Sequence, residues 1–362
     1  MSTHAPVGIG IIGAGYISSI YLENCTTRFD NLRVVGVADI VPANAQRQAE
    51  RYGVAAMSID DLLASPEIEI VVNLTIPAAH GEVALQAIEA GKSVYNEKPL
   101  AATRESAREV LDRAAERGVL VGSAPDTFLG GGLQTARALL DEGLIGTPVA
   151  VTGMMLTSGH ERWHPNPDFY YKPGGGPLFD MGPYYLAAML SLLGPVVRVS
   201  GTATATYETR TIKSGPRKGE VITVETPTHI LATLDFAEGP RASLTTSFDV
   251  HDTRHSTLVL YGSEGTLRLP DPNTFGGPLE HLRAGADQWE SIEVSRPFTD
   301  NSRGLGVSDM ARALRDDAPH RASGELGYHI VDIMHAVLES SEQGRHVPVT
   351  STFARPQPLT AG

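Results

Sequence analysis

The segment that decides the fold reads Ser93-Val-Tyr-Asn-Glu-Lys-Pro-Leu100, an apolar run that ends in a charged pair and a proline. The apolar part is typical of a short buried strand. Pro99 cannot donate a hydrogen bond to a sheet and restricts the backbone of Lys98, so the strand has to end here. Glu97 and Lys98 are therefore expected at the carboxyl end of a strand, the edge of an open α/β sheet where ligands bind. Lys98 would be only a solvated turn residue if the chain offered no cofactor site.

The composition is that of an ordinary globular chain, and its 362 residues suffice for two domains with cores of their own. The formal net charge of −13 argues against nucleic acid or an anionic membrane surface as a partner. The single cysteine, Cys25, excludes an internal disulfide and a cysteine zinc cluster, and the histidines show no ligand-like spacing. Neither a signal peptide nor a membrane span is predicted. We expect a cytoplasmic protein without a metal.

A dinucleotide-binding loop is predicted near the start of the chain, between a strand at Val7–Ile12 and a helix from about 16 to 28. Its sequence Gly13-Ala-Gly-Tyr-Ile-Ser18 follows the pattern G-x-G-x-x-G/A, with a small serine at the last position. Gly13 permits the tight turn, and Gly15 lets the backbone approach a pyrophosphate that the helix N-terminus then binds. The loop alone is a weak indication, but the strand before it and the helix after it are the context that the motif requires.

The acidic residue expected for NAD is Asp39, at the end of a predicted strand over 32–38. A carboxylate there accepts both ribose hydroxyls of NAD and repels the 2′-phosphate of NADP. Asp39 is followed by Ile40 and not by a basic residue, so NAD is favoured over NADP. Arg47 on the next helix leaves NADP as an alternative cofactor. The alternative is that Asp39 only caps that helix.

Helices and strands alternate up to residue 124, which predicts a parallel, doubly wound sheet. Thr75-Ile76-Pro77 ends a strand at the same edge as Glu97-Lys98-Pro99. We expect this segment to line the nicotinamide side of the cofactor-binding groove. His80 begins the next helix and either lines the cofactor site or is a surface residue. The predicted cofactor-binding residues are Gly13, Gly15, Tyr16, Ile17, Asp39, Ile40, Thr75, Ile76, Pro77, His80, Glu97 and Lys98.

After Ala124 the pattern changes to strands joined by short turns, which predicts an α+β domain with a largely antiparallel sheet. Strands are expected at 148–157, 196–207, 221–236, 242–250, 256–262 and 265–269, with helices at 129–142, 305–315 and 324–343. We therefore divide the chain into a Rossmann domain, residues 1–125, and a second domain, residues 126–362.

A second polar cluster is predicted at Gly174-Gly-Gly-Pro-Leu-Phe-Asp-Met-Gly-Pro-Tyr184, where three glycines and a proline bend the backbone. Asp180 is a natural N-cap for a helix that runs to Gly194. Asp180 and Tyr184 are four residues apart and would share one face of that helix. Each residue alone is explained by capping or packing, whereas the pair beside a bend forms a plausible acid/base site.

These motifs occur in the order found in the Gfo/Idh/MocA family (glucose–fructose oxidoreductase, inositol dehydrogenase and rhizopine-catabolism proteins), which the chain resembles over essentially its whole length. The resemblance implies a Rossmann domain followed by an α/β domain for substrate binding and oligomerisation, whose open, mostly antiparallel sheet forms homodimers or homotetramers. It also implies that Lys98 is the active-site lysine, that the Lys98–Pro99 peptide bond is cis, and that Asp180 and Tyr184 complete the catalytic set.

One position departs from the commonest family pattern, D-x-G-x-H, because Tyr184 stands where that pattern has histidine. A tyrosine there resembles the subgroup with glucose–fructose oxidoreductase, some xylose dehydrogenases and dihydrodiol dehydrogenases. A further aspartate that many inositol-type members carry on the helix is replaced by Ala187 and Ala188. A pyranose substrate is therefore better supported than an inositol.

The expected reaction is the NAD-dependent oxidation of a secondary hydroxyl of a sugar or sugar-like cyclic polyol. Tyr184 would be the acid/base, because the Lys98 ammonium beside a phenol lowers a pKa that is ordinarily about 10, and the two roles could be exchanged. Asp180 would orient the sugar or Lys98. The loop 160–167 is rich in aromatic, His and Asn side chains that bind sugars, although they could equally anchor the loop. The predicted substrate-binding residues are Lys98, Asp126, Trp163, His164, Asp180 and Tyr184.

Two other functions fit the same residues. A redox-neutral enzyme would use bound NAD to cleave a glycoside through a keto-sugar, or to pass hydride between two sugars. A non-catalytic NAD-binding regulator would keep the fold, but Glu97-Lys98-Pro99, Asp180 and Tyr184 argue against it.

Overall fold

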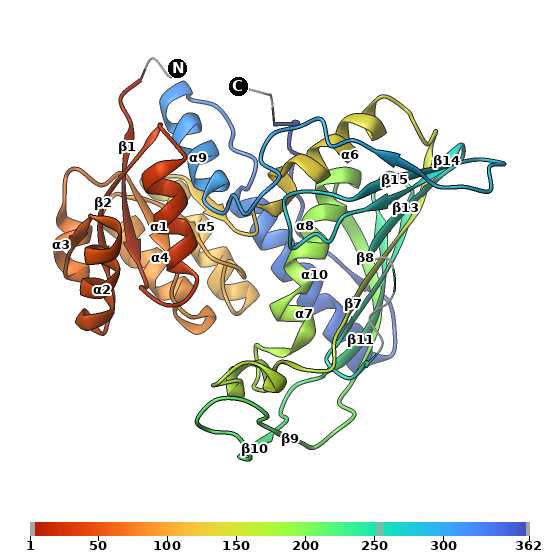
Figure 1. The fold of residues 1–362 in the computed structure, drawn as a ribbon, viewed down its shortest axis with the longest axis horizontal. Coiled ribbons are helices and arrows are strands. Elements are labelled where there is room, and N and C mark those ends of the chain that lie inside the picture. The colour runs from red at the N-terminus through yellow and green to blue at the C-terminus, as the bar shows by residue number, and fades with distance from the viewer. Residues whose placement is uncertain (1–3, 252–254, 256, 360–362) are drawn as a thin grey trace. The chain divides into compact units, whose positions relative to one another are not determined.

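The computed structural model describes residues 4–251, 255 and 257–359, and the chain divides into two compact units (Figure 1). The first unit comprises residues 1–129 and 301–331, and the second comprises residues 130–300 and 332–362. Residues 301–331 thus group with the N-terminal part of the chain, whereas the sequence division assigns them to the second domain. The assignment of a cofactor domain and a substrate domain stays a prediction.

The first unit is built on a parallel sheet of six strands in the order β3-β2-β1-β4-β5-β6. This is the doubly wound order, which confirms the predicted fold. In sheets of this kind ligands bind beyond the carboxyl ends of the strands at which the order reverses, here β1 and β4. The strands are β1 (Val7–Ile12), β2 (Leu32–Ala38), β3 (Ala55–Ala56), β4 (Ile70–Asn73), β5 (Ser93–Asn96) and β6 (Val121–Ser123). The helices of this unit are α1 (Ser18–Thr27), α2 (Pro42–Tyr52), α3 (Ile59–Ala64), α4 (His80–Glu89), α5 (Arg104–Arg117) and α9 (Leu305–Asp316), with short 3₁₀ turns at Pro77–Ala79 and Thr127–Leu129.

Local sequence explains where these elements start and stop. The β1 side chains are buried throughout, as expected for a central strand of a parallel sheet covered on both faces. Ser58 accepts the N–H of Asp61 at the start of α3, and Thr103 accepts the N–H of Ser106 at the start of α5, as N-cap side chains do. Helix α5 is followed by the C-cap residue Gly118, which adopts the left-handed conformation that glycine tolerates.

The second unit is built on a nine-stranded sheet in the order β16-β15-β14-β13-β7-β12-β11-β8-β17. Only β7 and β12 pair in parallel among the described strands of this sheet, so the predicted mostly antiparallel sheet is confirmed. Helices α6 (Gly131–Asp141), α7 (Gly176–Asp180) and α8 (Gly182–Leu193) cover one of its faces (Figure 1). Helix α10 (Gly324–Gln343) begins in the first unit and ends in the second. The strands are β7 (Pro148–Leu156), β8 (Val196–Thr204), β11 (His229–Phe236), β12 (Arg241–Ser247), β13 (Leu258–Gly262), β14 (Gly265–Leu269), β15 (Leu279–Arg283), β16 (Glu290–Ile292) and β17 (Val347–Pro348).

One long strand expected at 221–236 is divided in two. Residues Val221–Thr223 form β10, which pairs with β9 (Thr209–Thr211) in a hairpin separate from the large sheet, and the chain enters the large sheet only at β11. Pro227 lies between the two strands and has no N–H to donate, so it cannot continue a central ladder. The strand expected at 256–262 is β13, and Ser256 lies outside the described residues.

The expected N-cap role of Asp180 is wrong. Asp180 is the last residue of α7, and the N-cap of α8 is Met181, which makes no side-chain cap. The break follows from two prolines, because Pro177 opens α7 and Pro183 opens α8, each at a position where a missing N–H costs nothing. Asp180 and Tyr184 therefore lie on two successive helices rather than on one helix face. No helix in the described part of the chain is long and apolar enough to cross a membrane.

Candidate functional site

The glycine loop follows β1 with the geometry that its sequence predicts. Gly13 has a φ of +104°, and a Cβ there would lie 2.6 Å from the carbonyl group of Leu74, so this turn requires glycine. A Cβ on Gly15 would have no heavy atom within 4 Å, so the backbone at this position faces open space. The Ser18 hydroxyl donates to the Gly15 carbonyl at 2.6 Å and closes the loop onto the start of α1.

Asp39 is joined to this loop by a hydrogen bond. Its Oδ2 accepts the N–H of Ala14 at 2.7 Å, and its Oδ1 accepts the N–H of Val41 at 2.8 Å, with the Asn44 amide 3.4 Å away. The N-cap of α2 is Val41, so Asp39 is not merely the cap of that helix. Arg47, the residue that leaves NADP as an alternative cofactor, is exposed and donates to the Asn44 side chain at 2.8 Å.

His80 is a buried residue at the start of α4, and the expectation of a surface residue is excluded. Its Nδ1 lies 2.6 Å from the Pro99 carbonyl oxygen, and its Nε2 lies 3.1 Å from the Thr75 carbonyl oxygen. Burial lowers the pKa of His80. The two carbonyl groups act in the opposite direction, because they favour the protonated ring. His80 thus connects the segments that follow β4 and β5, whereas a contact of His80 with a cofactor stays a prediction.

Glu97 and Lys98 follow β5 at the same sheet edge. The buried Glu97 carboxylate accepts the Tyr21 hydroxyl at 2.9 Å and the N–H of Lys98 at 2.9 Å. The Lys98 side chain is half-buried, and the Lys98–Pro99 peptide bond is cis, as the resemblance implies. Gly13, Asp39, Thr75 and Lys98 therefore all follow parallel strands at their carboxyl ends and gather at one edge of the sheet.

This edge fits a dinucleotide. The open backbone at Gly15 and the start of α1 offer a place for a pyrophosphate, and the Asp39 carboxylate beside the loop offers acceptors for ribose hydroxyls. Tyr16, Ile40 and Ile76, which follow β1, β2 and β4 in the chain, have exposed side chains. Which of these residues contact a cofactor stays a prediction.

Asp126, a predicted substrate contact, is buried within the first unit. One oxygen, Oδ2, accepts the N–H groups of Gly304 at 2.9 Å and Gly306 at 3.0 Å, at the N-terminal end of α9. Burial raises the pKa of Asp126 to about 6, although the two N–H groups and Arg303 act in the opposite direction. Asp126 thus holds the start of α9, and its contact with a substrate stays a prediction.

In the second unit, His160 joins Asp180 to Trp163. His160 Nε2 lies 2.9 Å from Oδ2 of Asp180, and the Trp163 indole N–H donates to His160 Nδ1 at 3.3 Å. Because an indole N–H can only donate, Nδ1 must accept, so the proton of the neutral ring is on Nε2 and is donated to Asp180. We infer this tautomer from the geometry.

Aromatic side chains surround this group. The His160 ring lies 4.5 Å from both Tyr170 and Phe248, measured between ring centroids, and the His164 ring lies 5.3 Å from Trp163. Trp163 is 58% exposed and therefore available as a flat apolar surface, whereas Tyr184 is buried. Burial lowers the pKa of His164, whose Nδ1 accepts the N–H of Asn166 at 3.1 Å.

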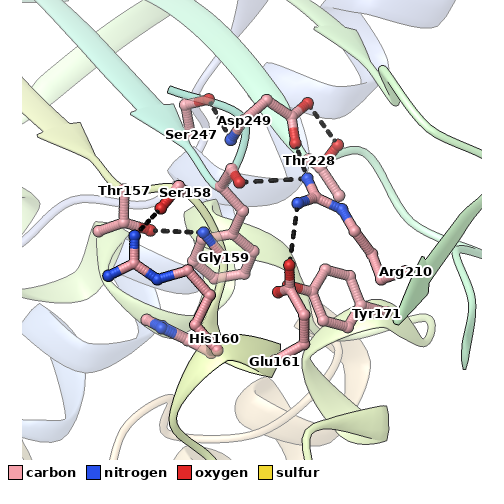
Figure 2. Close-up of polar contacts among 12 residues, drawn as sticks. Thr157, Ser158, Gly159, His160, Glu161, Tyr171, Arg210, Thr228, Ser247 and Asp249 are labelled. Carbon is pink, nitrogen blue, oxygen red and sulfur yellow. Dashed lines mark hydrogen bonds and ion pairs between the residues drawn. The ribbon is translucent and has the colours of Figure 1, made fainter. Parts of the chain in front are cut away.

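Sequence reasoning had assigned no individual role to His160, and it missed the buried charges next to it (Figure 2). Arg210 lies between the carboxylates of Glu161 and Asp249, and the side chains of all three are less than a tenth exposed. No short motif marks this cluster, because its members come from three separate segments. Among the described residues, no group of three or more His, Cys, Asp or Glu side chains could hold a metal ion.

Comparison with known protein families gives two matches along the chain. Residues 7–124 match the model described as "Oxidoreductase family, NAD-binding Rossmann fold". Residues 133–268 match the model described as "GFO/IDH/MocA C-terminal domain". Together the two models cover parts of both units and leave out residues 1–6, 125–132 and 269–362.

Relatives cover nearly the whole chain. The D-glucoside 3-dehydrogenase of Escherichia coli is 29% identical over 95% of this chain and 98% of that protein. The scyllo-inositol 2-dehydrogenase (NADP(+)) of Bacillus subtilis is 24% identical over 94% of this chain and 95% of that protein. A solved structure of levoglucosan dehydrogenase in complex with NADH superposes with a TM-score of 0.82 at 20% identity, covering 96% of this chain and all of that one.

The fold, the order of the motifs and both family models lead to the same assignment. The chain belongs to the Gfo/Idh/MocA family of oxidoreductases, with an N-terminal NAD-binding Rossmann fold.

Proposed function

We propose that this protein is an NAD-dependent dehydrogenase that oxidises a secondary hydroxyl of a sugar or sugar-like cyclic polyol. The observation that carries the proposal is the Asp39 carboxylate, bonded to Ala14 of the glycine loop at the edge where Lys98 also lies. The relatives named for glucosides and inositols support a sugar or polyol as the substrate class. Asp39 supports NAD over NADP, because a second negative charge at the ribose would be repelled.

The residues proposed to bind NAD are those predicted at the sheet edge: Gly13, Gly15, Tyr16, Ile17, Asp39, Ile40, Thr75, Ile76, Pro77, His80, Glu97 and Lys98. When bound, NAD supplies a hydride acceptor at nicotinamide C4. The protein has to remove the hydroxyl proton, and we assign this step to Tyr184 as base with the Lys98 ammonium as its stabilising partner. The Glu97 carboxylate fixes the backbone N–H of Lys98 and so limits the positions that this lysine can adopt.

Substrate orientation is assigned to the second unit. Asp180 is proposed to accept a sugar hydroxyl, Trp163 to contact the apolar face of a pyranose, and His164 to bond a further hydroxyl. The large sheet is proposed as the surface for a homodimer or homotetramer, since Val197, Leu231 and Tyr261 are exposed on its strands.

The experiment is a panel of pyranoses, anhydrosugars, inositols and glycosides, each tested with NAD⁺ and with NADP⁺ while nicotinamide fluorescence is followed. We expect NADH to form with one sugar class and NAD⁺ to be preferred. Lys98→Ala should abolish turnover while NAD⁺ still binds. Lys92→Ala is the matched control, because Lys92 precedes the same strand and its ammonium bonds only the Ser65 carbonyl among the side-chain contacts described for it.

A failed panel would distinguish the alternatives. Mass spectrometry that finds retained NAD(H) in the purified protein, with no net NADH formation, would favour the redox-neutral sugar enzyme. Binding of NAD⁺ without any turnover, including in a glycoside-cleavage assay, would contradict an enzyme and favour the regulator.

A further inference from the structure

A buried cluster of three charged side chains lies beside His160 and has no role in the reaction as proposed so far (Figure 2). The side chains of Glu161, Arg210 and Asp249 are 2%, 9% and 5% exposed. Charged groups are removed from water at a cost and are retained in an interior only where they are well paired. The cluster is therefore a feature whose geometry is closely determined.

Arg210 is the centre of the cluster. Its Nη1 donates to Glu161 Oε1 at 3.2 Å, and its Nη2 donates to the Phe248 carbonyl at 3.1 Å and to the Asp249 carboxylate. The planar guanidinium thus holds two segments of the chain at once, which the single ammonium of a lysine could not do in the same geometry.

Both of these segments touch His160. Glu161 is its neighbour in the chain, and the Phe248 ring lies 4.5 Å from the His160 ring, centroid to centroid. The Glu161 carboxylate also accepts the Tyr171 hydroxyl, and a Cβ on Gly159 would collide with it at 2.2 Å, so the loop is closely fitted around this side chain. A displacement of Arg210 would therefore change the position of the imidazole from two sides.

The position of His160 in turn determines that of Asp180. His160 Nε2 donates to Asp180 at 2.9 Å, while the Trp163 indole N–H occupies Nδ1 and keeps the donor on Nε2. The direction of the Asp180 carboxylate thus depends on a ring that Arg210 fixes indirectly.

We propose that Arg210 is a positioning residue for the reaction: it acts through Glu161 and Phe248 on His160, which orients Asp180. This inference rests on the proposed function only where it assigns Asp180 to the substrate.

The test compares two identical substitutions on one hairpin. Arg210→Lys keeps the positive charge and removes the two separate Nη donor groups of the guanidinium. Arg217→Lys is the control, because Arg217 lies in the β9–β10 connection and pairs with Asp168 and Glu220, with no described contact to His160, Glu161 or Phe248.

Two readouts separate a positioning role from a merely structural one. The first is the ¹⁵N resonances of the His160 imidazole, assigned by their loss in His160→Gln. The second is turnover with the sugar found in the panel. Arg210→Lys should shift or broaden the Nε2 resonance and lower kcat roughly 10- to 100-fold, with the Kd for NAD⁺ unchanged. Arg217→Lys should alter neither.

A double-mutant cycle shows whether the effect passes through His160. In the His160→Gln background, Arg210→Lys should cause no further loss of kcat, because the link to Asp180 is already changed. An equal loss in both backgrounds would overturn the proposal, as would an unchanged His160 resonance in a folded Arg210→Lys protein.

The resonance test is independent of turnover. If no sugar is oxidised, the proposed function fails, while the His160 resonance still decides whether Arg210 positions this ring. If Arg210→Lys does not fold, Glu161→Gln weakens the pairing through which Arg210 acts and should shift the same resonance by a smaller amount. An unchanged resonance in that variant would overturn the proposal.

Discussion

The two units each bury carboxylates but stabilise them by different means. Asp126 in the first unit receives two backbone N–H groups at the start of α9, and its pKa is raised to about 6. Glu161 and Asp249 in the second unit face the full positive charge of Arg210. Partial charges at a helix N-terminus compensate burial incompletely, whereas a guanidinium can pair with both carboxylates.

This difference predicts opposite responses to neutralisation. The Asp126 site needs an acceptor oxygen more than it needs a charge, because both N–H groups bond the same oxygen. The Arg210 cluster needs its cation, since removal of the guanidinium would leave two carboxylates buried near each other. Three substitutions test the comparison.

Arg210→Met is expected to have the largest effect. It leaves Glu161 and Asp249 without their cation, and breaking a buried ion pair in this way costs about 3–5 kcal/mol. Urea unfolding followed by tryptophan fluorescence measures the loss, because both tryptophans of the chain, Trp163 and Trp289, belong to the second unit.

The matched control removes the charges together. Arg210→Met combined with Glu161→Gln and Asp249→Asn should regain part of the lost stability, because no unpaired charge remains buried. A loss below about 1 kcal/mol for Arg210→Met alone, the size expected of an exposed ion pair, would contradict the contrast between the units.

Asp126→Asn is expected to have the opposite sign at neutral pH. The folded-state pKa of about 6 lies above the ordinary value of 3.8, so folding takes up a proton between these values. The contribution of Asp126 to stability is therefore complete below pH 3.8 and is lost as the pH rises through about 6, a change of about 2–3 kcal/mol. Asparagine keeps the acceptor oxygen and removes this loss, so the variant should be more stable than the wild type at pH 7.5 and gain nothing at pH 4.

Hydrogen exchange of the Gly304 and Gly306 amides reports on this site directly, since Asp126 accepts both of their N–H groups. Protection should be retained in Asp126→Asn and should vary less with pH than in the wild type. A variant that is less protected at pH 7.5 would show that the charge itself holds α9.

The parallel sheet of the first unit could be predicted in detail because local rules determine it, whereas the grouping of residues 301–331 with this unit was not predicted. Three of the cofactor candidates lie just after a strand end: Gly13 after β1, Asp39 after β2 and Lys98 after β5. In a parallel sheet, the carboxyl ends of the strands lie at one edge regardless of the conformation of the loops. The spacing of these residues along the chain was therefore enough to predict that they gather at that edge. The cis bond before Pro99 came from family resemblance rather than from any local rule.

The second unit could be predicted only in outline. Most of the antiparallel strands were predicted from their apolar runs, but the short strands β9, β15, β16 and β17 were missed. Arg210 meets Glu161 and Asp249 across 49 and 39 residues, and no local pattern encodes such pairs. The break between α7 and α8 was missed because Asp180 resembles an N-cap, while Pro183 restarts the helix after it. Side-chain networks thus require the fold before they can be identified.

Tyr171→Phe is expected to have the smallest effect and refines the comparison. Burial and the neighbouring Glu161 raise the pKa of Tyr171, so its hydroxyl stays protonated and donates to that carboxylate. Its removal deletes one donor and leaves Arg210 in place, which should cost about 1–2 kcal/mol in the same urea experiment. If the loss equals that of Arg210→Met, the carboxylate depends on its full set of donors and not on the cation, and the two units would stabilise their buried acids in the same way. Tyr171→Phe can also be added to the variant that combines Arg210→Met, Glu161→Gln and Asp249→Asn, in which no charged acceptor remains for the Tyr171 hydroxyl. If Tyr171→Phe causes the same small loss of stability there, the role of Tyr171 is confined to packing.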